Sequence, residues 1–270
     1  MKVIVDGTEV AVAPGATLLD ACQAAGVDPP TLCYGPTIAP KNACRVCVVE
    51  LEGSRTLVPS CSRAAEDGMV VHTGTDRVRR SRRMVLELLA SSVDLSSPAQ
   101  AVGWIEEYGA DPERQQGATV DQPVKLDNDL YVRDYAKCIL CYQCVDACGE
   151  QWQGTFAIAI AGRGMASVVS TEWDAPLTES ACVYCGNCVQ VCPTGALVGV
   201  VEHTMRAEGT WAPERQAVTT TVCAFCGVGC NLELHTQDGR IVKVTSPPDH
   251  PVTHGNLCIK GRFGWAHVHG

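Results

Sequence analysis

This sequence of 270 residues has few aromatic residues, no long apolar run and no excess of positive charge. Aromatic side chains make up 5% of a chain that is 46% hydrophobic, which predicts several small cores instead of one large core. The longest apolar stretches, such as 156–161 and 197–201, are far shorter than the roughly 20 residues of a membrane-spanning helix. The start, MKVIVDG, lacks the basic segment and apolar core of a secretory signal. A soluble, cytoplasmic protein with no membrane span is therefore expected.

The charge balance disfavours nucleic acid as a partner. With a formal net charge of −9, the chain would be repelled by phosphates in non-specific binding. One basic run, RVRRSRR at 77–83, is the exception, and we expect it to be the solvated face of a helix that continues into MVLELLA. A docking surface for an acidic partner is the alternative. The buried side of this helix is predicted to comprise Val78, Met84, Val85, Leu88 and Leu89.

Cysteine, in contrast, is abundant, with 17 residues in the chain. An odd number, the missing export signal and the tight CxxC spacing disfavour disulfides and favour metal ligation. Sixteen of the cysteines fall into four groups of four. Cys22 is left over, inside a predicted helix, and is expected to be a small buried core residue.

The first group follows a predicted strand pair and a short helix. KVIVDG and TEVAVAPG are predicted strands that turn at Asp6, TLLDACQAAG is a predicted helix, and VVELEG and TLVPS form a predicted hairpin. This order is that of a ubiquitin-like ferredoxin. The spacing departs from the plant-type C-x4-C-x2-C pattern, and it resembles instead the [2Fe–2S] domain of the large iron–sulfur subunit of respiratory NADH dehydrogenase and of related hydrogenases. A zinc site is the alternative. The group consists of Cys33, Cys44, Cys47 and Cys61.

The second and third groups each have the spacing C-x2-C-x2-C-x3-C of bacterial ferredoxins, in KCILCYQCVDACGE and ACVYCGNCVQVCPTGAL. In such tandem runs the fourth cysteine of one motif ligates the cluster of the other. One [4Fe–4S] cluster is therefore assigned to Cys138, Cys141, Cys144 and Cys192, and a second to Cys182, Cys185, Cys188 and Cys148. The long segment between the runs is expected to add a hairpin, in WQGTFAIAIAGRGMASVVS.

The fourth group spans TVCAFCGVGC and GNLCIKG, and comprises Cys223, Cys226, Cys230 and Cys258. LELHT and IVKVTS, joined by QDGR, are a predicted hairpin that returns Cys258 to the first three. The group resembles the small [4Fe–4S] domain that opens the catalytic subunit of molybdenum or tungsten bis-pterin enzymes, above all formate dehydrogenase. The resemblance implies that Lys260 lies between cluster and pterin. Zinc is again the alternative.

One cluster of the relatives is expected to be absent. In the respiratory and hydrogenase subunits a His-x3-Cys-x2-Cys-x5-Cys motif follows the [2Fe–2S] domain, whereas this chain has Ser92 and Ser96 at the positions of its histidine and first cysteine. We also find no persuasive pair of nucleophile and base and no room for a pterin-binding domain, so no catalytic residue is assigned.

Taken together, the motifs resemble the N-terminal portion of the alpha subunit of NAD-dependent formate dehydrogenase. The resemblance implies an α+β, modular iron–sulfur protein with one [2Fe–2S] and three [4Fe–4S] clusters. It also implies flavin/NAD-binding diaphorase subunits that carry FMN, and a molybdopterin catalytic subunit that carries a Mo or W bis-pterin, as partners. The small diaphorase subunit of an NAD-reducing hydrogenase and a structural zinc scaffold are the alternatives. The predicted parts are a [2Fe–2S] ferredoxin-like domain at 1–78, a helix and linker at 79–129, a 2[4Fe–4S] ferredoxin domain at 130–207 and a small β-rich [4Fe–4S] domain at 208–270.

Overall fold

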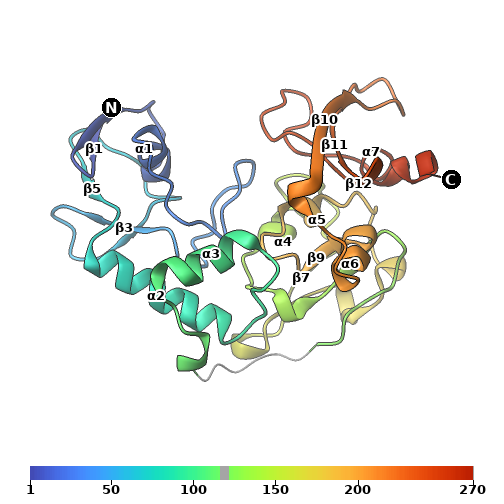
Figure 1. Cartoon of the computed structure of the whole chain (residues 1–270), viewed down its shortest axis with the longest axis horizontal. Coiled ribbons are helices and arrows are strands. Elements are labelled where there is room, and N and C mark those ends of the chain that lie inside the picture. Colours follow the sequence, from blue (N-terminus) through green and yellow to red (C-terminus); the bar gives the residue numbers. More distant parts are fainter. Residues whose placement is uncertain (116–121, 270) are drawn as a thin grey trace. The chain divides into compact units, whose positions relative to one another are not determined.

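The computed structural model describes residues 1–115 and 122–269, so residues 116–121 of the predicted linker lie outside the described part. The described chain divides into two compact units (Figure 1). The first holds residues 1–34, 39–115 and 137–141, and the second holds residues 35–38, 122–136 and 142–269. No helix in these described ranges is long and apolar enough to cross a membrane.

A five-stranded mixed sheet forms the base of the first unit, with strand order β2-β1-β5-β3-β4. The β1–β2 hairpin turns on Asp6 and Gly7, whose φ angles of 46° and 86° are those of a type I′ turn. β5 joins β1 in parallel and β3 in antiparallel pairing. Both predicted hairpins therefore form, and β5 joins them into one sheet by pairing with β1 and with β3. The strands are β1 (Lys2–Val5), β2 (Thr8–Ala11), β3 (Val48–Leu51), β4 (Val58–Pro59) and β5 (Val70–His72).

Helix α1 (Leu18–Ala24) packs on this sheet and begins at a capping box. Thr17 accepts a hydrogen bond from the Asp20 amide, and the Asp20 carboxylate accepts one from the Thr17 amide, which satisfies two free donors of the first turn. Cys22 is fully buried in the core that α1 shares with β1 and β5, as the sequence predicts.

Helices α2 (Asp76–Ala90) and α3 (Ala99–Tyr108) pack against each other (Figure 1). Leu86 of α2 and Ala101 of α3 share a core cluster with Cys33 and Cys44. The predicted buried side of α2 is wrong in part. Val78 is buried, but Met84 and Leu88 are each 50% exposed, and Arg82 and Leu86 are buried instead. Arg82 can be buried because its guanidinium donates to the Val48 carbonyl at 2.9 Å and to the Tyr108 hydroxyl at 2.9 Å.

The second unit contains two short antiparallel strand pairs and one larger sheet. The expected hairpin between the ferredoxin runs is β7 (Ala159–Ala161) with β8 (Val168–Ser170), and β6 (Tyr131–Arg133) pairs with β9 (Leu197–Gly199). The sheet β10-β11-β12 contains the predicted QDGR hairpin, with Asp238 and Gly239 at φ 52° and 78°. Its strands are β10 (Gln216–Val222), β11 (Asn231–Gln237) and β12 (Arg240–Thr245).

Cys144 and Cys148 lie in α4 (Gln143–Cys148), and Cys188 lies in α5 (Asn187–Val191). Cys258 directly precedes α7 (Ile259–Phe263), and α6 (Val200–Ala207) follows β9. Contacts between α4 and α5 bring the two ferredoxin runs together. Short 3-10 turns in the described residues are η1 (Pro112–Arg114), η2 (Tyr135–Lys137), η3 (Gly164–Ala166), η4 (Glu172–Asp174), η5 (Leu177–Glu179), η6 (Pro213–Arg215) and η7 (Gly264–His269).

Candidate iron–sulfur cluster sites

The first cysteine group lies wholly in the first unit and is buried. Cys33 and Cys61 are 2% and 1% exposed, and Cys44 and Cys47 are also buried. The four thiols face one another as two hydrogen-bonded pairs, Cys33 with Cys44 and Cys61 with Cys47. The bond from Cys33 lowers the pKa of Cys44 to about 6, and the bond from Cys61 lowers the pKa of Cys47 to about 7. Each of these two bonds thus favours the thiolate form of one sulfur, which is the form that ligates metal.

This pairwise arrangement fits a binuclear cluster better than one metal ion. A structural zinc site needs four ligands at about 2.3 Å from one centre. Two iron atoms, by contrast, can each take one pair of thiolates. The Cys44 amide also donates to the Cys33 sulfur at 3.3 Å, a contact that stabilises a charged sulfur.

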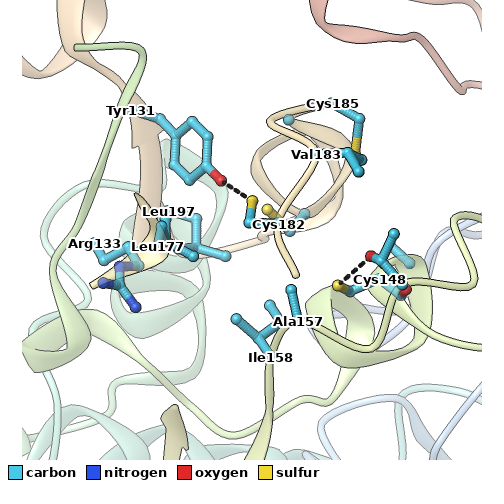
Figure 2. A pocket seen from close by; sticks show the side chains of 14 residues that line it. Tyr131, Arg133, Cys148, Ala157, Ile158, Leu177, Cys182, Val183, Cys185 and Leu197 are labelled. Atoms are coloured by element: carbon cyan, nitrogen blue, oxygen red, sulfur yellow. Dashed lines mark hydrogen bonds between the residues drawn. The ribbon is translucent and has the colours of Figure 1, made fainter. Parts of the chain in front are cut away.

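The second unit brings Cys148 to Cys182, Cys185 and Cys188. The half-buried Cys188 faces all three of the others, and its pKa is raised by burial and then by these neighbours. All four sulfur-bearing residues line one cavity together with Tyr131, Thr155 and Leu177 (Figure 2). Cys148 comes from α4 and the others from the next run, so residues of both runs meet here. The assignment of these four to one cluster stays a prediction.

Two hydroxyl groups contact sulfurs of this group (Figure 2). The Tyr131 hydroxyl lies 3.2 Å from Cys182 Sγ, and the Thr155 hydroxyl lies 3.4 Å from Cys148 Sγ. Burial raises the pKa of Tyr131, and the nearby Cys188 raises it further, so the phenol stays protonated and can donate. Hydrogen bonds to ligating sulfurs stabilise negative charge on a cluster and therefore raise its potential.

A Tyr131→Phe variant is expected to lower the reduction potential of the cluster held by this group. The ring would keep its stacking on Phe263, at 6.1 Å between centroids, but lose the hydroxyl donor. If the bond favours the reduced state by about 1 kcal/mol, the midpoint falls by roughly 40 mV for one electron. A redox titration followed by electron paramagnetic resonance measures this shift, with the [2Fe–2S] signal as the internal reference. An unchanged midpoint would show that the contact does not stabilise the reduced state.

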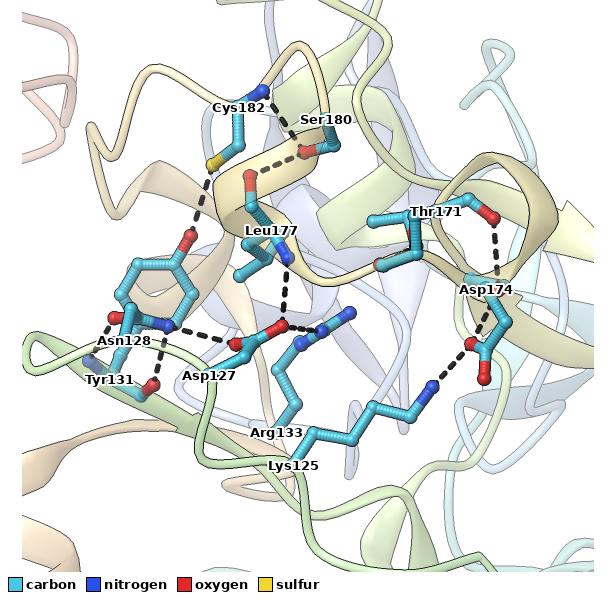
Figure 3. A network of polar contacts seen from close by, with 12 residues as sticks. Lys125, Asp127, Asn128, Tyr131, Arg133, Thr171, Asp174, Leu177, Ser180 and Cys182 are labelled. Atoms are coloured by element: carbon cyan, nitrogen blue, oxygen red, sulfur yellow. Dashed lines mark hydrogen bonds and ion pairs between the residues drawn. The ribbon is translucent and has the colours of Figure 1, made fainter.

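A buried polar network holds the loop before Cys182 against β6 (Figure 3). Asp127 forms an ion pair with Arg133, which is 1% exposed, and accepts a hydrogen bond from the Leu177 amide at 2.7 Å. Ser180 bridges the Leu177 carbonyl and the Cys182 amide. The ion pair thereby fixes the segment from which Cys182 reaches the cavity. A second ion pair, between Lys125 and Asp174, lies at the exposed edge.

The remaining ferredoxin group is divided between the units. Cys138 and Cys141 belong to the first, and Cys144 and Cys192 belong to the second. Cys141 and Cys144 are each 8% exposed, and Cys192 Sγ accepts a hydrogen bond from the Leu197 amide at 3.4 Å. The assignment of these four to one cluster stays a prediction.

The fourth group gathers on the loops beside the β10-β11-β12 sheet. Cys230 faces the other three, Cys223, Cys226 and Cys258, and the amide of Cys223 donates to the carbonyl of Cys230 at 2.8 Å. The predicted hairpin thus returns Cys258 to the CxxCxxxC loop. In contrast to the first group, Cys226 and Cys258 are exposed, and so is Lys260 on α7.

Sequence reasoning missed the residues that surround the cysteines, including Tyr131, Asp127, Arg133 and Arg262. Tyr131, Asp127 and Arg133 lie outside the cysteine motifs. Arg262 lies four positions after Cys258, the last cysteine of its motif. The sequence offers one signal, the stretch DNDLYVRDY, in which charged and aromatic residues lie close together just before the first ferredoxin run. Strand β10 was also missed, because QAVTTTV has threonines on both faces and most of it is exposed.

Family profiles match three parts of the chain. The 2Fe-2S iron-sulfur cluster binding domain matches residues 1–76, the 4Fe-4S dicluster domain matches residues 137–196, and the molybdopterin oxidoreductase Fe4S4 domain matches residues 216–270. These three domains bear out the predicted order of iron–sulfur motifs.

Several curated proteins are similar to nearly the whole chain. NADPH-Fe(3+) oxidoreductase subunit alpha of Geobacter sulfurreducens is 34% identical over 275 residues, which are 99% of this chain and 31% of that protein. An NADH-quinone oxidoreductase subunit of Rhizobium meliloti is 34% identical over 98% of this chain and 31% of its own. A Staphylococcus aureus protein named provisionally as a formate dehydrogenase is 28% identical, with coverage of 99% and 31%. The chain therefore spans about a third of the length of these relatives.

A solved structure also resembles the chain. The crystal structure of an NAD+-reducing [NiFe]-hydrogenase in the H2-reduced state contains a chain that is 28% identical and aligns with a TM-score of 0.65, covering 74% of this chain and 87% of that one. The resemblance to formate dehydrogenase, NADH dehydrogenase and hydrogenase subunits is thus confirmed. Over the part of each relative that it covers, the chain is similar to these proteins, and it contains regions that match a 2Fe-2S iron-sulfur cluster binding domain, a 4Fe-4S dicluster domain and a molybdopterin oxidoreductase Fe4S4 domain.

Proposed function

We propose that the chain is the electron-transfer iron–sulfur subunit, or the N-terminal part, of an NAD-dependent formate dehydrogenase complex. It passes electrons between a molybdopterin site that holds Mo or W and a flavin/NAD module. The observation that carries the proposal is that cysteines gather in quartets within one chain. In addition, the two terminal domains are similar to those of proteins that handle different redox partners. The similarity in fold supports this function only by analogy. The cysteine quartets are the part of the chain that would carry out its chemistry.

The proposed cofactors are one [2Fe–2S] and three [4Fe–4S] clusters. The proposed ligands are those assigned above, and the proposed domains are a ubiquitin-like ferredoxin at 1–78, a helical linker at 79–129, a bacterial ferredoxin at 130–207 and a β-rich domain at 208–270. The buried pairs of the first group and the crossed quartet around Cys188 support these sets.

Such clusters supply one-electron transfer with little movement of their ligands. The protein's own residues bury the sulfurs, keep water from them and donate hydrogen bonds to them. Cys33 and Cys61 are almost fully buried, and Tyr131 and Thr155 contact sulfurs of the ferredoxin quartet. The exposed Cys226 and Cys258, with Lys260 beside them, suit an approach to a pterin held by another domain or subunit.

The native assembly tests the complete proposal. Purified anaerobically, it is expected to contain molybdenum or tungsten together with FMN, and formate should reduce its iron–sulfur signals before NAD is reduced. An assembly with nickel and no formate-dependent reduction would favour the second candidate, the small diaphorase subunit of an NAD-reducing hydrogenase. That candidate is supported by the hydrogenase structure that aligns with 74% of the chain. The match of residues 216–270 to the molybdopterin oxidoreductase Fe4S4 domain favours formate dehydrogenase.

A Cys226→Ser variant is expected to lose one [4Fe–4S] signal in electron paramagnetic resonance and keep the [2Fe–2S] signal. Cys226 belongs to the second unit, whereas the first quartet lies wholly in the first unit. The quartets therefore have separate supporting cores. Loss of every signal at once would contradict this separation.

A further inference from the structure

Arg262 is a buried cation next to the ferredoxin quartet. It is 4% exposed, and it lies on α7, the helix that begins after Cys258. Its Nε donates to the Cys185 carbonyl at 3.0 Å, and its Nη2 donates to Asn187 Oδ1 at 3.0 Å. Both acceptors lie in the loop that connects Cys185 to Cys188. A residue of the C-terminal domain therefore holds the cluster-binding loop of the ferredoxin domain.

The hydrogen-bond acceptors of Arg262 are all neutral. Its third contact is the Val244 carbonyl, at 3.4 Å, and among the described residues no carboxylate pairs with it. The ionisable side chains that face it are the thiols of Cys185 and Cys188, which become negatively charged when they ligate a metal. The other strongly buried guanidinium of this unit, Arg133, pairs with Asp127. Because a buried charge is costly unless it is paired, the negative partner of Arg262 is expected at the quartet itself.

The close packing around Arg262 keeps its charge in place. Gly186 has a φ of +69°, and a Cβ there would lie 2.3 Å from Arg262 Cδ and 2.7 Å from the Phe263 ring. Phe263 in turn stacks on Tyr131, whose hydroxyl contacts Cys182. Glycine at position 186 thus permits α7 to approach the loop, and the neighbouring rings leave the guanidinium little freedom to move towards solvent.

We propose that Arg262 is a counter-charge that the C-terminal domain supplies to the ferredoxin cluster of Cys148, Cys182, Cys185 and Cys188, and that it raises the reduction potential of this cluster. The inference rests on the proposed cluster at this quartet. A guanidinium stays protonated in proteins, and the reduced cluster carries one more negative charge than the oxidised cluster. A fixed positive charge nearby therefore stabilises the reduced state more than the oxidised state. Arg262 is a positioning and tuning residue, not a ligand.

Redox titration of the full chain, reconstituted anaerobically and followed by electron paramagnetic resonance, tests this role. The relevant signal is the one that Cys148→Ala removes. Arg262→Gln, which removes the charge but retains an amide donor, is expected to lower the equilibrium constant for reduction at least tenfold, about 59 mV for one electron. Arg262→Lys keeps the positive charge and should therefore lie closer to the parent midpoint than Arg262→Gln does. The matched control is Arg215→Gln, which removes an equal charge from the same domain at a side chain that is 55% exposed and paired with Asp238. It should leave the midpoint unchanged.

An Arg262→Gln protein that keeps the cluster and its parent midpoint would overturn the proposal. If Arg262→Gln loses this one signal, Arg262→Lys decides. Retention of the signal in the lysine variant supports a need for charge, while its loss in both variants would show that the hydrogen bonds to Cys185 and Asn187 are what matters. Absence of the signal from the parent protein would instead reject the proposed cluster, and thus the proposed function. The two failures are therefore distinguishable.

Discussion

Cys148→Ala and Cys192→Ala are expected to remove different [4Fe–4S] clusters. Each variant should remove the cluster whose other three ligands lie in the other ferredoxin motif. Cys148 ends the first ferredoxin run, yet Cys188 of the second run faces it, and both line one cavity. Cys148→Ala should therefore remove the same signal as Cys188→Ala, together with about four iron atoms per chain. Cys192→Ala should remove the signal that Cys144→Ala removes.

Cys22→Ala is the matched control for these ligand variants. Cys22 is fully buried, and burial raises its pKa to about 12, so it is a packed thiol and not a ligand. Its substitution should leave the iron content and every resonance signal unchanged. If Cys148→Ala and Cys144→Ala removed the same signal, the clusters would follow the order of the motifs and the crossed assignment would be wrong.

Asp127→Asn is expected to destabilise the second unit by about 3–5 kcal/mol, because it removes the charged partner of a buried guanidinium. Arg133 is 1% exposed, and Asp127 is the carboxylate that forms an ion pair with its guanidinium. The same carboxylate anchors the Leu177 amide ahead of Cys182 (Figure 3). Denaturant unfolding of the holoprotein, followed by the loss of cluster absorbance, measures the change in free energy.

Asp174→Asn is the control for this variant. Asp174 also forms an ion pair, with Lys125, but its side chain is 62% exposed. An exposed pair is worth about 0–1 kcal/mol, so the control should unfold near the parent's midpoint. Equal effects of the two substitutions would contradict a special role for the buried pair.

The ion pair of Asp127 also predicts a dependence of stability on pH. Burial alone would raise the pKa of Asp127, but the Leu177 amide, Asn128 and Arg133 together hold it below its ordinary value. Because the folded-state pKa lies below the unfolded value of about 3.9, this stabilisation is present above about pH 4 and is lost as the pH falls through the folded value. The Asp127→Asn protein should lack this component of acid destabilisation.

Much of the local structure could be predicted because short-range chemistry determines it. Asp6-Gly7 and Asp238-Gly239 adopt positive φ angles and turn their hairpins as expected. Thr17 begins α1, and the spacing of the cysteines anticipates which of them meet around Cys188 and Cys230. In these cases the residues that interact are close in sequence, or they belong to cysteine motifs with a recognisable spacing.

The unpredicted features depend on tertiary contacts. Apolar periodicity predicts Met84 and Leu88 in the core, yet α2 buries Arg82, because carbonyl and hydroxyl acceptors satisfy its guanidinium. Arg262 likewise follows a cysteine motif with no local sign of burial, and its burial depends on a loop 77 residues earlier in the chain. Local pattern carries no information on such acceptors, so buried cations were missed in both units.

Iron, acid-labile sulfide and zinc measured together on the anaerobically purified chain test the central claim most directly. A brown protein with about fourteen iron atoms per chain and an equal amount of sulfide, in the absence of zinc, is the predicted result for one [2Fe–2S] and three [4Fe–4S] clusters. A colourless protein with stoichiometric zinc and no sulfide would contradict it, since the same thiolates would then hold structural ions that cannot carry electrons.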